Sequence, residues 1–397
     1  MSNSPLVPTG YGVVTKNVVF RLKKSGFDVD VVAYWGQEGS AIQIEGVTIY
    51  PKLFDIYGRD AARLVLSHVK PDVFITLFDV WVGVDWLPRL HPRWLAYTPV
   101  DHDPIPNAIY EALKYAFKPI AMSRFGFEKM KEAGLDAEYI PHGVDVKLFT
   151  PGDKAEARRK NLHRFEDAFI VGINAANKGY RKDFPRMFAA FKMFLDQNPD
   201  AAKNSYLYIN SWALFPEGLN LHELAKVYEV KKNAILVNEW KKYVGMPDVD
   251  MVEWYRTLDV FLNLARGEGF GIPIVEAQAC GVPVIATDFS SMTELVKDHG
   301  WLIPPRDVDL TPLYSYQALA DVEKACDAIN DAYNHPEKTE KFGREARKFT
   351  VENYDYDEKI LPMWIDLLNR VDEESKKAAE KLEALVIKAK AKARAGK

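Results

Sequence analysis

The sequence predicts an α/β protein with two Rossmann-like domains, each built on a parallel sheet, and a cleft between them. Short apolar strands alternate with amphipathic helices, which is typical of parallel sheets covered by helices on both faces. About a dozen strands are expected, too many for one comfortable open sheet. A Pro151-Gly152 break near the middle of the chain divides them into two sets.

The bulk composition fits a globular protein and argues against several other classes. The chain has 397 residues, of which 48% are hydrophobic, and this length favours roughly two or three domains. A net charge of -4 gives no overall field toward nucleic acid. The only two cysteines, Cys280 and Cys326, lack metal-ligand spacing. No apolar run reaches the roughly 18 residues of a membrane span. We therefore expect a cytoplasmic protein.

The first domain is expected to cover residues 1–150. Its runs of β-branched and aromatic residues predict strands at Val29–Ala33, Val73–Leu77, Trp94–Tyr97, Pro119–Ala121 and Glu138–Ile140. Apolar residues at helical spacing predict helices at Thr15–Ser25, Asp60–Ser67, Ala108–Ala116 and Arg124–Ala133. A Rossmann domain begins with a strand that leads into a glycine turn. Here the turn, Pro8 to Gly12, arrives almost at once, so that strand is either absent or reduced to a stub such as Leu6-Val7.

The second domain is expected to cover residues 151–347. Its predicted strands are Phe169–Ile173, Tyr206–Ile209, Ala234–Leu236, Val260–Leu262, Val284–Ala286 and Trp301–Ile303. Helices are predicted at Lys154–Asn161, Phe184–Gln197 and Ile272–Cys280, the last closed by Gly281.

The C-terminal part is predicted to be helical. Residues 350–371 carry apolar side chains at helical spacing and are expected to pack back on the first domain. Residues 372–397 form a Lys/Ala-rich helical tail, read as a solvated helix or as a contact for anionic lipid or a partner. The basic residues of the first helix leave the same choice between a solvated face and peripheral membrane contact: Lys16, Arg21, Lys23 and Lys24.

Two glutamates flank a Gly-Phe-Gly turn in residues 268–276, EGFGIPIVE. A strand, a glycine loop and a helix start form an anion site, because the first backbone N–H groups are free and the helix dipole favours negative charge. Glu276 lies one turn beyond Ile272 and can accept two hydroxyl groups, while Glu268 stands in the loop. The pattern predicts a ligand with a phosphate middle and polyol ends. The alternative is a helix-capping Glu268 and a surface Glu276.

A second candidate site is the basic loop 174–182, NAANKGYRK, which follows a predicted strand. Lys178, Arg181 and Lys182 at the carboxyl end of a strand suit pyrophosphate binding. The alternative is a solvated basic loop.

These segments resemble the retaining, two-domain (GT-B) glycosyltransferases of family 4. Glu268 to Glu276 with the following apolar residues is similar to their E-x7-E signature. Residues 10–12 (GYG) resemble the N-terminal glycine loop that faces the donor phosphates. Residues 121–126 resemble the S-x-F helix start, and residues 140–151 the segment that enters the second domain. The resemblance covers nearly the whole chain.

The resemblance implies roles for particular residues. Gly269, Phe270, Gly271, Ile272, Glu276 and Gly12 would bind the donor, Glu268 the sugar hydroxyls, and Lys182 the phosphates. The family's phosphate-binding Arg position falls on Asn177, so Arg181 or Lys178 would supply that charge. No cofactor or metal is implied.

Asp101 and His102, after a first-domain strand, are the candidates for the family's histidine beside the transferred sugar. Capping of a turn is the structural alternative. A metal site at Asp101-His102-Asp103 is disfavoured because adjacent residues on a strand cannot all face one ion.

Five further positions belong to candidate segments. Ser290 and Ser291 stand where the family usually has two glycines, which can alter backbone approach to the ligand. Glu294 is expected to order the neighbouring loop or helix start, and His142 to be structural. Trp240 either stacks on a nucleotide base or packs.

The sequence therefore predicts a retaining glycosyltransferase that moves a sugar from a nucleotide-diphosphate sugar to an acceptor hydroxyl. The acceptor (a sugar, a glycan or a lipid-linked molecule) is left open, because first-domain loops would bind it. An epimerase or a phosphorylase is disfavoured, the latter because no pyridoxal-phosphate lysine motif is present. A non-catalytic nucleotide-sugar-binding or scaffold protein is the alternative from another class, favoured by the reduced first strand and by Asn177.

Overall fold

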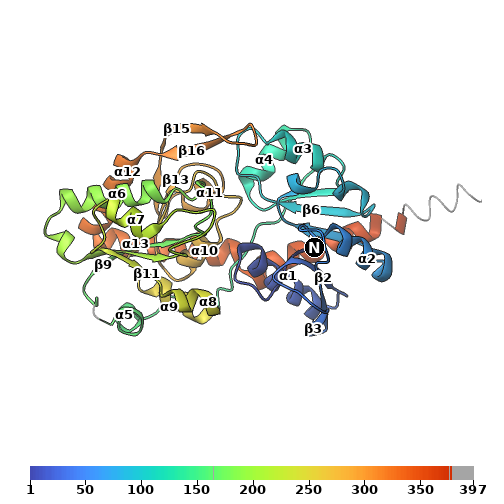
Figure 1. The fold of residues 1–397 in the computed structure, drawn as a ribbon, viewed down its shortest axis with the longest axis horizontal. Helices are drawn as coiled ribbons and strands as arrows, with labels where there is room; N and C mark the ends of the chain where they lie inside the picture. The colour runs from blue at the N-terminus through green and yellow to red at the C-terminus, as the bar shows by residue number, and fades with distance from the viewer. Residues whose placement is uncertain (164, 375, 378–397) are drawn as a thin grey trace, which may run out of the picture.

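The computed structural model describes residues 1–163, 165–374 and 376–377, and its larger sheets lie in the two halves of the chain (Figure 1). In the first half the hydrogen-bonded orders are β3-β4-β2-β1 and β5-β6-β7-β8. Only β3, at the edge, runs antiparallel to its neighbour. The strands are β1 (Ser2–Asn3), β2 (Asp30–Trp35), β3 (Ile42–Ile44), β4 (Val47–Pro51), β5 (Phe74–Leu77), β6 (Trp94–Thr98), β7 (Lys118–Ala121) and β8 (Glu138–Tyr139).

The strand expected before the glycine turn is β1, which has only two residues and lies upstream of Leu6-Val7. It pairs in parallel with β2, and the Leu77 amide donates to Met1 O at 2.9 Å, which joins β1 to β5. The two sets of strands in the first half therefore meet at β1. Sequence patterns could not place this strand because its residues, Ser2 and Asn3, are polar although both are buried.

Helix α1 (Gly10–Lys24) begins at Gly10 rather than at the predicted Thr15. Thr9 supplies the N-cap, because its Oγ1 accepts a hydrogen bond from Gly12 N at 3.1 Å. Glycine is a poor helix former, so the pattern alone did not indicate this first turn. The other helices of this half are α2 (Arg59–Val69), α3 (Asn107–Leu113) and α4 (Arg124–Glu132), with 3-10 turns at Val80–Gly83 and Leu87–Arg89.

The sheet of the second half is parallel throughout, in the order β11-β10-β9-β12-β13-β14, which is the strand order of a doubly wound Rossmann fold. Its strands are β9 (Phe169–Asn174), β10 (Ser205–Asn210), β11 (Ala234–Leu236), β12 (Val260–Asn263), β13 (Val284–Thr287) and β14 (Trp301–Ile303). Its helices are α5 (Lys154–Leu162), α6 (Phe184–Gln197), α7 (Leu221–Val227), α8 (Glu239–Val244), α9 (Asp248–Arg256), α10 (Ile272–Ala279), α11 (Ser291–Val296) and α12 (Val322–Asn334), with a 3-10 turn at Ala201–Lys203. The predicted fold class, two Rossmann-like parallel sheets, is confirmed.

An antiparallel hairpin that the sequence did not predict leaves the second half after β14. It consists of β15 (Pro305–Leu310) and β16 (Tyr316–Ala320), and it extends over the gap toward α3 and α4 of the first half (Figure 1). Its first strand carries one proline and three charged residues, so no apolar run marks it in the sequence.

The chain crosses between the halves twice, and the two crossings are hydrogen-bonded to each other. Val144 N donates to Tyr354 O at 2.8 Å, and Tyr356 N donates to Val144 O at 3.3 Å. The second crossing follows α13 (Pro336–Tyr354), continues as a π-helical turn at Tyr356–Ile360 and ends in a helix over residues 361–374.

The final helix packs on the first half through Trp364, which lies edge-on to Tyr97 of β6 with ring centroids 5.1 Å apart. Most of the tail predicted for residues 372–397 lies outside the described residues. Among those described, none of the helices combines the length and the apolar character needed to cross a bilayer.

Candidate functional site

The N-termini of α1 and α10 meet between the two halves. Ile272, the first residue of α10, places its Cδ1 3.8 Å from the point that a Cβ on Gly10 would occupy. Gly271 precedes α10 with φ 102°, a left-handed conformation that favours glycine, and no side chain caps the first turn. Two helix starts, one from each half, therefore direct their positive dipole ends toward one region.

Beside α10, Glu268 is held by two cations from the loop after β9. Its Oε1 accepts a hydrogen bond from Lys182 Nζ, and its Oε2 accepts one from Arg181 Nη1 at 2.9 Å. Arg181 Nη1 also donates to Gly267 O at 2.7 Å. The loops after β9 and β12 are thus tied together by charge.

This pairing shifts the pKa values of the cluster. Burial alone would raise the pKa of Glu268, but the charges of Lys182 and Arg181 outweigh it and lower the pKa to about 2. Burial lowers the pKa of Lys182, and Glu268 offsets part of that effect. Glu268 is therefore ionised throughout the physiological range.

Asp101 and His102, in the loop that follows β6, face this cluster from the first half. Asp101 Oδ2 lies 3.8 Å from Arg181 Nη1, and its Oδ1 lies 2.6 Å from His102 Nδ1. Burial opposes ionisation of Asp101, yet His102 and Arg181 hold the pKa of this carboxyl below its usual value. The predicted residues Glu268, Lys182, Arg181, Asp101 and His102 thus come together.

Sequence reasoning missed a second carboxylate on this side. Asp79, just after β5, accepts a hydrogen bond from Tyr11 Oη at 3.1 Å. Its pKa is raised by burial and by the nearby charge of Asp101. An Asp after a strand was an available signal, but no motif singled it out.

The serines that replace the expected glycines hold the Glu268 loop. Glu268 N donates to Ser290 Oγ at 2.9 Å. Ser291 Oγ contacts both Glu268 O at 2.8 Å and Phe270 O at 2.6 Å. Both serines are buried. The hydroxyl groups of Ser290 and Ser291, which glycines would lack, therefore hold the Glu268 loop in place.

The glycines of this loop are required by contacts between the halves. A Cβ on Gly267 would lie 2.4 Å from Asp101 O, and one on Gly269 would lie 2.3 Å from Pro99 Cβ. Phe270, predicted to bind the donor, is a buried residue that packs on His142 and Tyr354 at centroid distances of 5.2 and 5.5 Å.

Three other predicted donor-binding residues lie outside the cluster. Asn177 is buried and bonds to the 212–219 loop: Nδ2 donates to Trp212 O and Leu219 O, and Oδ1 accepts from Leu219 N. Lys178 forms an exposed pair with Glu217. Gly12 has no room for a side chain, since its Cβ would lie 2.2 Å from Val7 O, and its amide is used by Thr9. Local packing explains all three.

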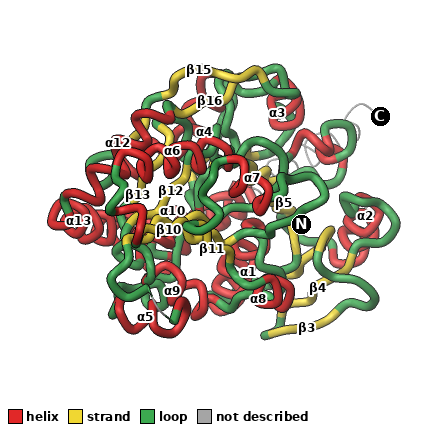
Figure 2. The backbone as a smooth tube through the Cα atoms, turned by 60° about the vertical axis from the view of Figure 1, so that its left-hand side comes forward, coloured by secondary structure: helices red, strands yellow, loops and turns green. Residues whose placement is uncertain are grey.

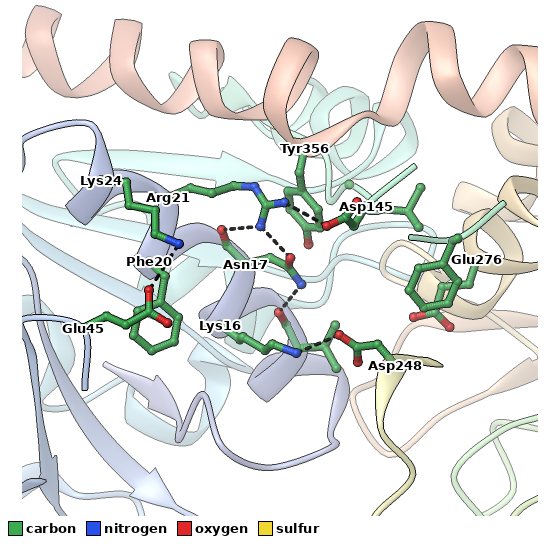
Figure 3. A pocket seen from close by; sticks show the side chains of 14 residues that line it. Lys16, Asn17, Phe20, Arg21, Lys24, Glu45, Asp145, Asp248, Glu276 and Tyr356 are labelled. Atoms are coloured by element: carbon green, nitrogen blue, oxygen red, sulfur yellow. Dashed lines mark hydrogen bonds and ion pairs between the residues drawn. The ribbon is translucent and has the colours of Figure 1, made fainter. Parts of the chain in front are cut away.

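Glu276, on α10, lines a pocket of about 190 Å³ between α1 and the second half (Figure 3). Its Oε2 accepts from Tyr255 Oη at 2.8 Å, and that hydroxyl also accepts from Asn174 Nδ2 at 2.7 Å. Burial raises the pKa of Glu276 to about 8. Tyr255 and Asn174 were not predicted to support this glutamate.

The basic residues of α1 that raised the membrane alternative all pair with acids. Lys16 bridges to Asp248, the first residue of α9 in the second half, at 2.7 Å. Helices α1 and α9 both lie in the lower half of Figure 2. Figure 3 shows Arg21 with Asp145 and Lys24 with Glu45. The remaining pairs are Arg21 with Asp357 and Lys23 with Asp28. This face is neutralised within the molecule.

The remaining candidates are structural or exposed. Both carboxylate oxygens of Glu294 accept from Arg124 N, at 3.0 and 2.9 Å, at the start of α4. His142 is buried 2.6 Å from Tyr97 Oη, and burial lowers its pKa to about 3. Trp240 is 68% exposed on α8, beside Tyr243.

Comparisons with known proteins show similarity to glycosyltransferases. Residues 220–311, which include β12, the Glu268 loop and α10, match the family described as "Glycosyl transferases group 1". An 83-residue segment is 40% identical to O-antigen chain mannosyltransferase B of Escherichia coli, covering 21% of this chain and 22% of that protein. A 175-residue segment is 30% identical to a D-inositol 3-phosphate glycosyltransferase of Kribbella flavida, covering 43% and 40%. The matches thus span less than half of these curated relatives.

Solved structures align over the whole fold. Sucrose-phosphate synthase of Thermosynechococcus elongatus aligns with TM-score 0.75 at 17% identity, over 92% of this chain and 94% of that one. HepE of Anabaena, in complex with UDP-glucose, aligns with TM-score 0.67 at 16% identity, over 95% and 98%. The chain has the GT-B fold. In this GT-B protein, the Glu268 cluster lies where the two Rossmann-like halves meet.

Proposed function

We propose that the protein is a retaining glycosyltransferase that transfers a sugar from a nucleotide-diphosphate sugar to an acceptor hydroxyl. The observation that carries the proposal is the cluster of Glu268 with Arg181 and Lys182 beside two converging helix starts. Donors of this kind need positive charge at a diphosphate and hydrogen-bond acceptors at the sugar, and this cluster supplies both. The names of the relatives support the same reaction class.

In the proposed complex, the diphosphate rests on the first turn of α10 and is contacted by Arg181 and Lys182. Charge builds on the leaving diphosphate as the glycosidic bond breaks, so these cations stabilise the transition state more than the ground state. Glu268, released from the two cations, accepts hydrogen bonds from the sugar. Glu276 accepts hydrogen bonds from the ribose hydroxyls.

The first half contributes the groups that face the sugar and the acceptor. His102 and Asp101 come from the loop after β6, Asp79 from the loop after β5, and Tyr11 from the first turn of α1. Asp101 lies close to Gly267 and Pro99 lies close to Gly269, so the two halves approach each other here, and in the proposed complex this approach would exclude water from the reacting bond. Exclusion of water matters because hydrolysis competes with transfer.

The test is a screen of UDP-, GDP- and ADP-sugars for released nucleoside diphosphate, with a panel of soluble and lipid-linked acceptors. We expect turnover with one donor class, a product of unchanged anomeric configuration by NMR, and loss of turnover in Glu268→Ala. A folded protein that binds a nucleotide sugar but releases no diphosphate with any acceptor would instead establish the non-catalytic binding protein.

A further inference from the structure

The hairpin β15–β16 contacts both loops that carry the charged cluster. In the second half, Ala318 N donates to Arg266 O at 2.9 Å, and Asp309 accepts a hydrogen bond from Arg266 Nη1. Arg266 stands two residues before Glu268 in the same loop. The base of the hairpin therefore fixes the loop that presents Glu268.

The other end of the hairpin pairs with the loop that carries His102. Asp103 N donates to Tyr316 O at 3.0 Å, and Tyr316 N donates to Asp103 O at 3.2 Å. The fully buried Ser315 donates from Oγ to Pro104 O. These bonds join a hairpin of the second half to residues directly after His102 in the first.

The Tyr316 ring is half-exposed although the backbone of this residue is paired with Asp103. Tyr316 opposes Leu310 in the hairpin, and opposed residues in an antiparallel pair share a face. Their side chains are 45% and 56% exposed, whereas the neighbouring Gln317 is 4% exposed. The Tyr316 ring can therefore be removed separately from the backbone bonds that this residue makes to Asp103.

From these contacts we infer that Ser315 and the backbone of Tyr316 are positioning residues, which hold the loop that carries Asp101 and His102 beside the loop that carries Glu268. This inference rests on the proposed function. The groups assigned to the diphosphate, Arg181 and Lys182, lie outside the hairpin and its contact with Asp103. Loss of the contact should therefore reduce turnover while leaving donor affinity nearly unchanged.

The experiment compares two substitutions of one residue in the full chain. Tyr316→Pro removes the N–H that bonds to Asp103 O, whereas Tyr316→Ala removes the exposed ring and keeps the N–H. Amide hydrogen exchange over residues 98–103, measured without ligand, should be roughly ten-fold faster in Tyr316→Pro and as in the wild type in Tyr316→Ala. Unchanged exchange in Tyr316→Pro, or equal acceleration in both, would overturn the inference.

Turnover supplies the second readout. With the donor found in the screen, Tyr316→Pro should lower kcat at least roughly ten-fold with donor KM within about two-fold, and Tyr316→Ala should match the wild type. If the Ala318 amide in Tyr316→Pro also exchanges faster, that substitution has unfolded the hairpin. Ser315→Ala, which removes only the bond to Pro104 O, then replaces it, and the same exchange and turnover results decide whether the inference holds. A wild-type protein without transferase activity would defeat the proposed function, while the exchange measurement would still decide whether the hairpin holds the loop.

Discussion

Lys182 donates a hydrogen bond to the carboxylate of Glu268, and Arg181 binds the other oxygen of the same group. The side chains of Lys182 and Glu268 are 14% and 7% exposed, so neither charge is well solvated. A diphosphate that approaches these cations must compete with Glu268. In the proposed complex, the donor diphosphate therefore replaces Glu268 on the two cations, and this replacement frees Glu268 to bind the sugar.

Replacement of Glu268 by glutamine should separate binding from catalysis. Removal of the competing charge leaves Arg181 and Lys182 free, so UDP or GDP should bind a few-fold more tightly by calorimetry. Turnover should fall by at least about 100-fold, because a group that acts at the reacting sugar is lost. Glu217→Gln, in the surface pair with Lys178, is the matched control and should change neither value. Weaker nucleotide binding in Glu268→Gln would contradict this competition.

Lys182 and Lys178 lie in one loop but have different surroundings. Lys182→Gln should lower kcat by about 100-fold or more, since it removes positive charge beside the leaving diphosphate. Lys178→Gln should retain wild-type kinetics because Lys178 is paired on the surface. Steady-state release of nucleoside diphosphate distinguishes the two. Equal losses in both variants would show that the whole loop, rather than the Glu268 cluster, binds phosphate.

Asn177 should contribute to stability and not to donor binding. Asn177→Ala removes three hydrogen bonds that this buried residue makes to the 212–219 loop and should lower the free energy of unfolding by about 1–3 kcal/mol. Asn353→Ala, which removes one exposed bond to Phe349 O, should cost far less. Urea unfolding measures both. A loss of nucleotide affinity in folded Asn177→Ala at unchanged stability would place Asn177 in the site after all.

Glu276 should make stability depend on pH. Burial raises its folded-state pKa to about 8 from 4.5, so between these values the folded protein holds a proton that the unfolded chain has released. Stability must then fall as pH rises through this window. Relative to Glu276→Gln, the wild type should lose about 1–3 kcal/mol between pH 5 and pH 8. Parallel stability curves for the two proteins would refute the raised pKa.

Part of this organisation could be predicted from the sequence. The parallel strands, the bounds of α6 and the grouping of Glu268 with Lys182 follow from apolar periodicity and from the carboxyl-end rule for α/β sheets. These features are local in the chain or fixed by topology, so a pattern can reveal them.

Features that depend on contacts distant in sequence were missed. The hairpin β15–β16 is stabilised by backbone hydrogen bonds to Asp103 and Arg266. Such bonds do not depend on side-chain type, so they produce no pattern of apolar residues in the sequence. The Asp79–Tyr11 pair joins residues 68 positions apart. The bonds from the Asn177 amide to Trp212 and Leu219 also join residues 35 and 42 positions apart.

A crystal structure with the nucleotide sugar identified in the donor screen tests the central claim most directly. We expect the diphosphate between the first turns of α1 and α10, in contact with Arg181 and Lys182, with the ribose on Glu276 and Glu268 turned to the sugar. A diphosphate bound elsewhere, while both cations still hold Glu268, would contradict the account.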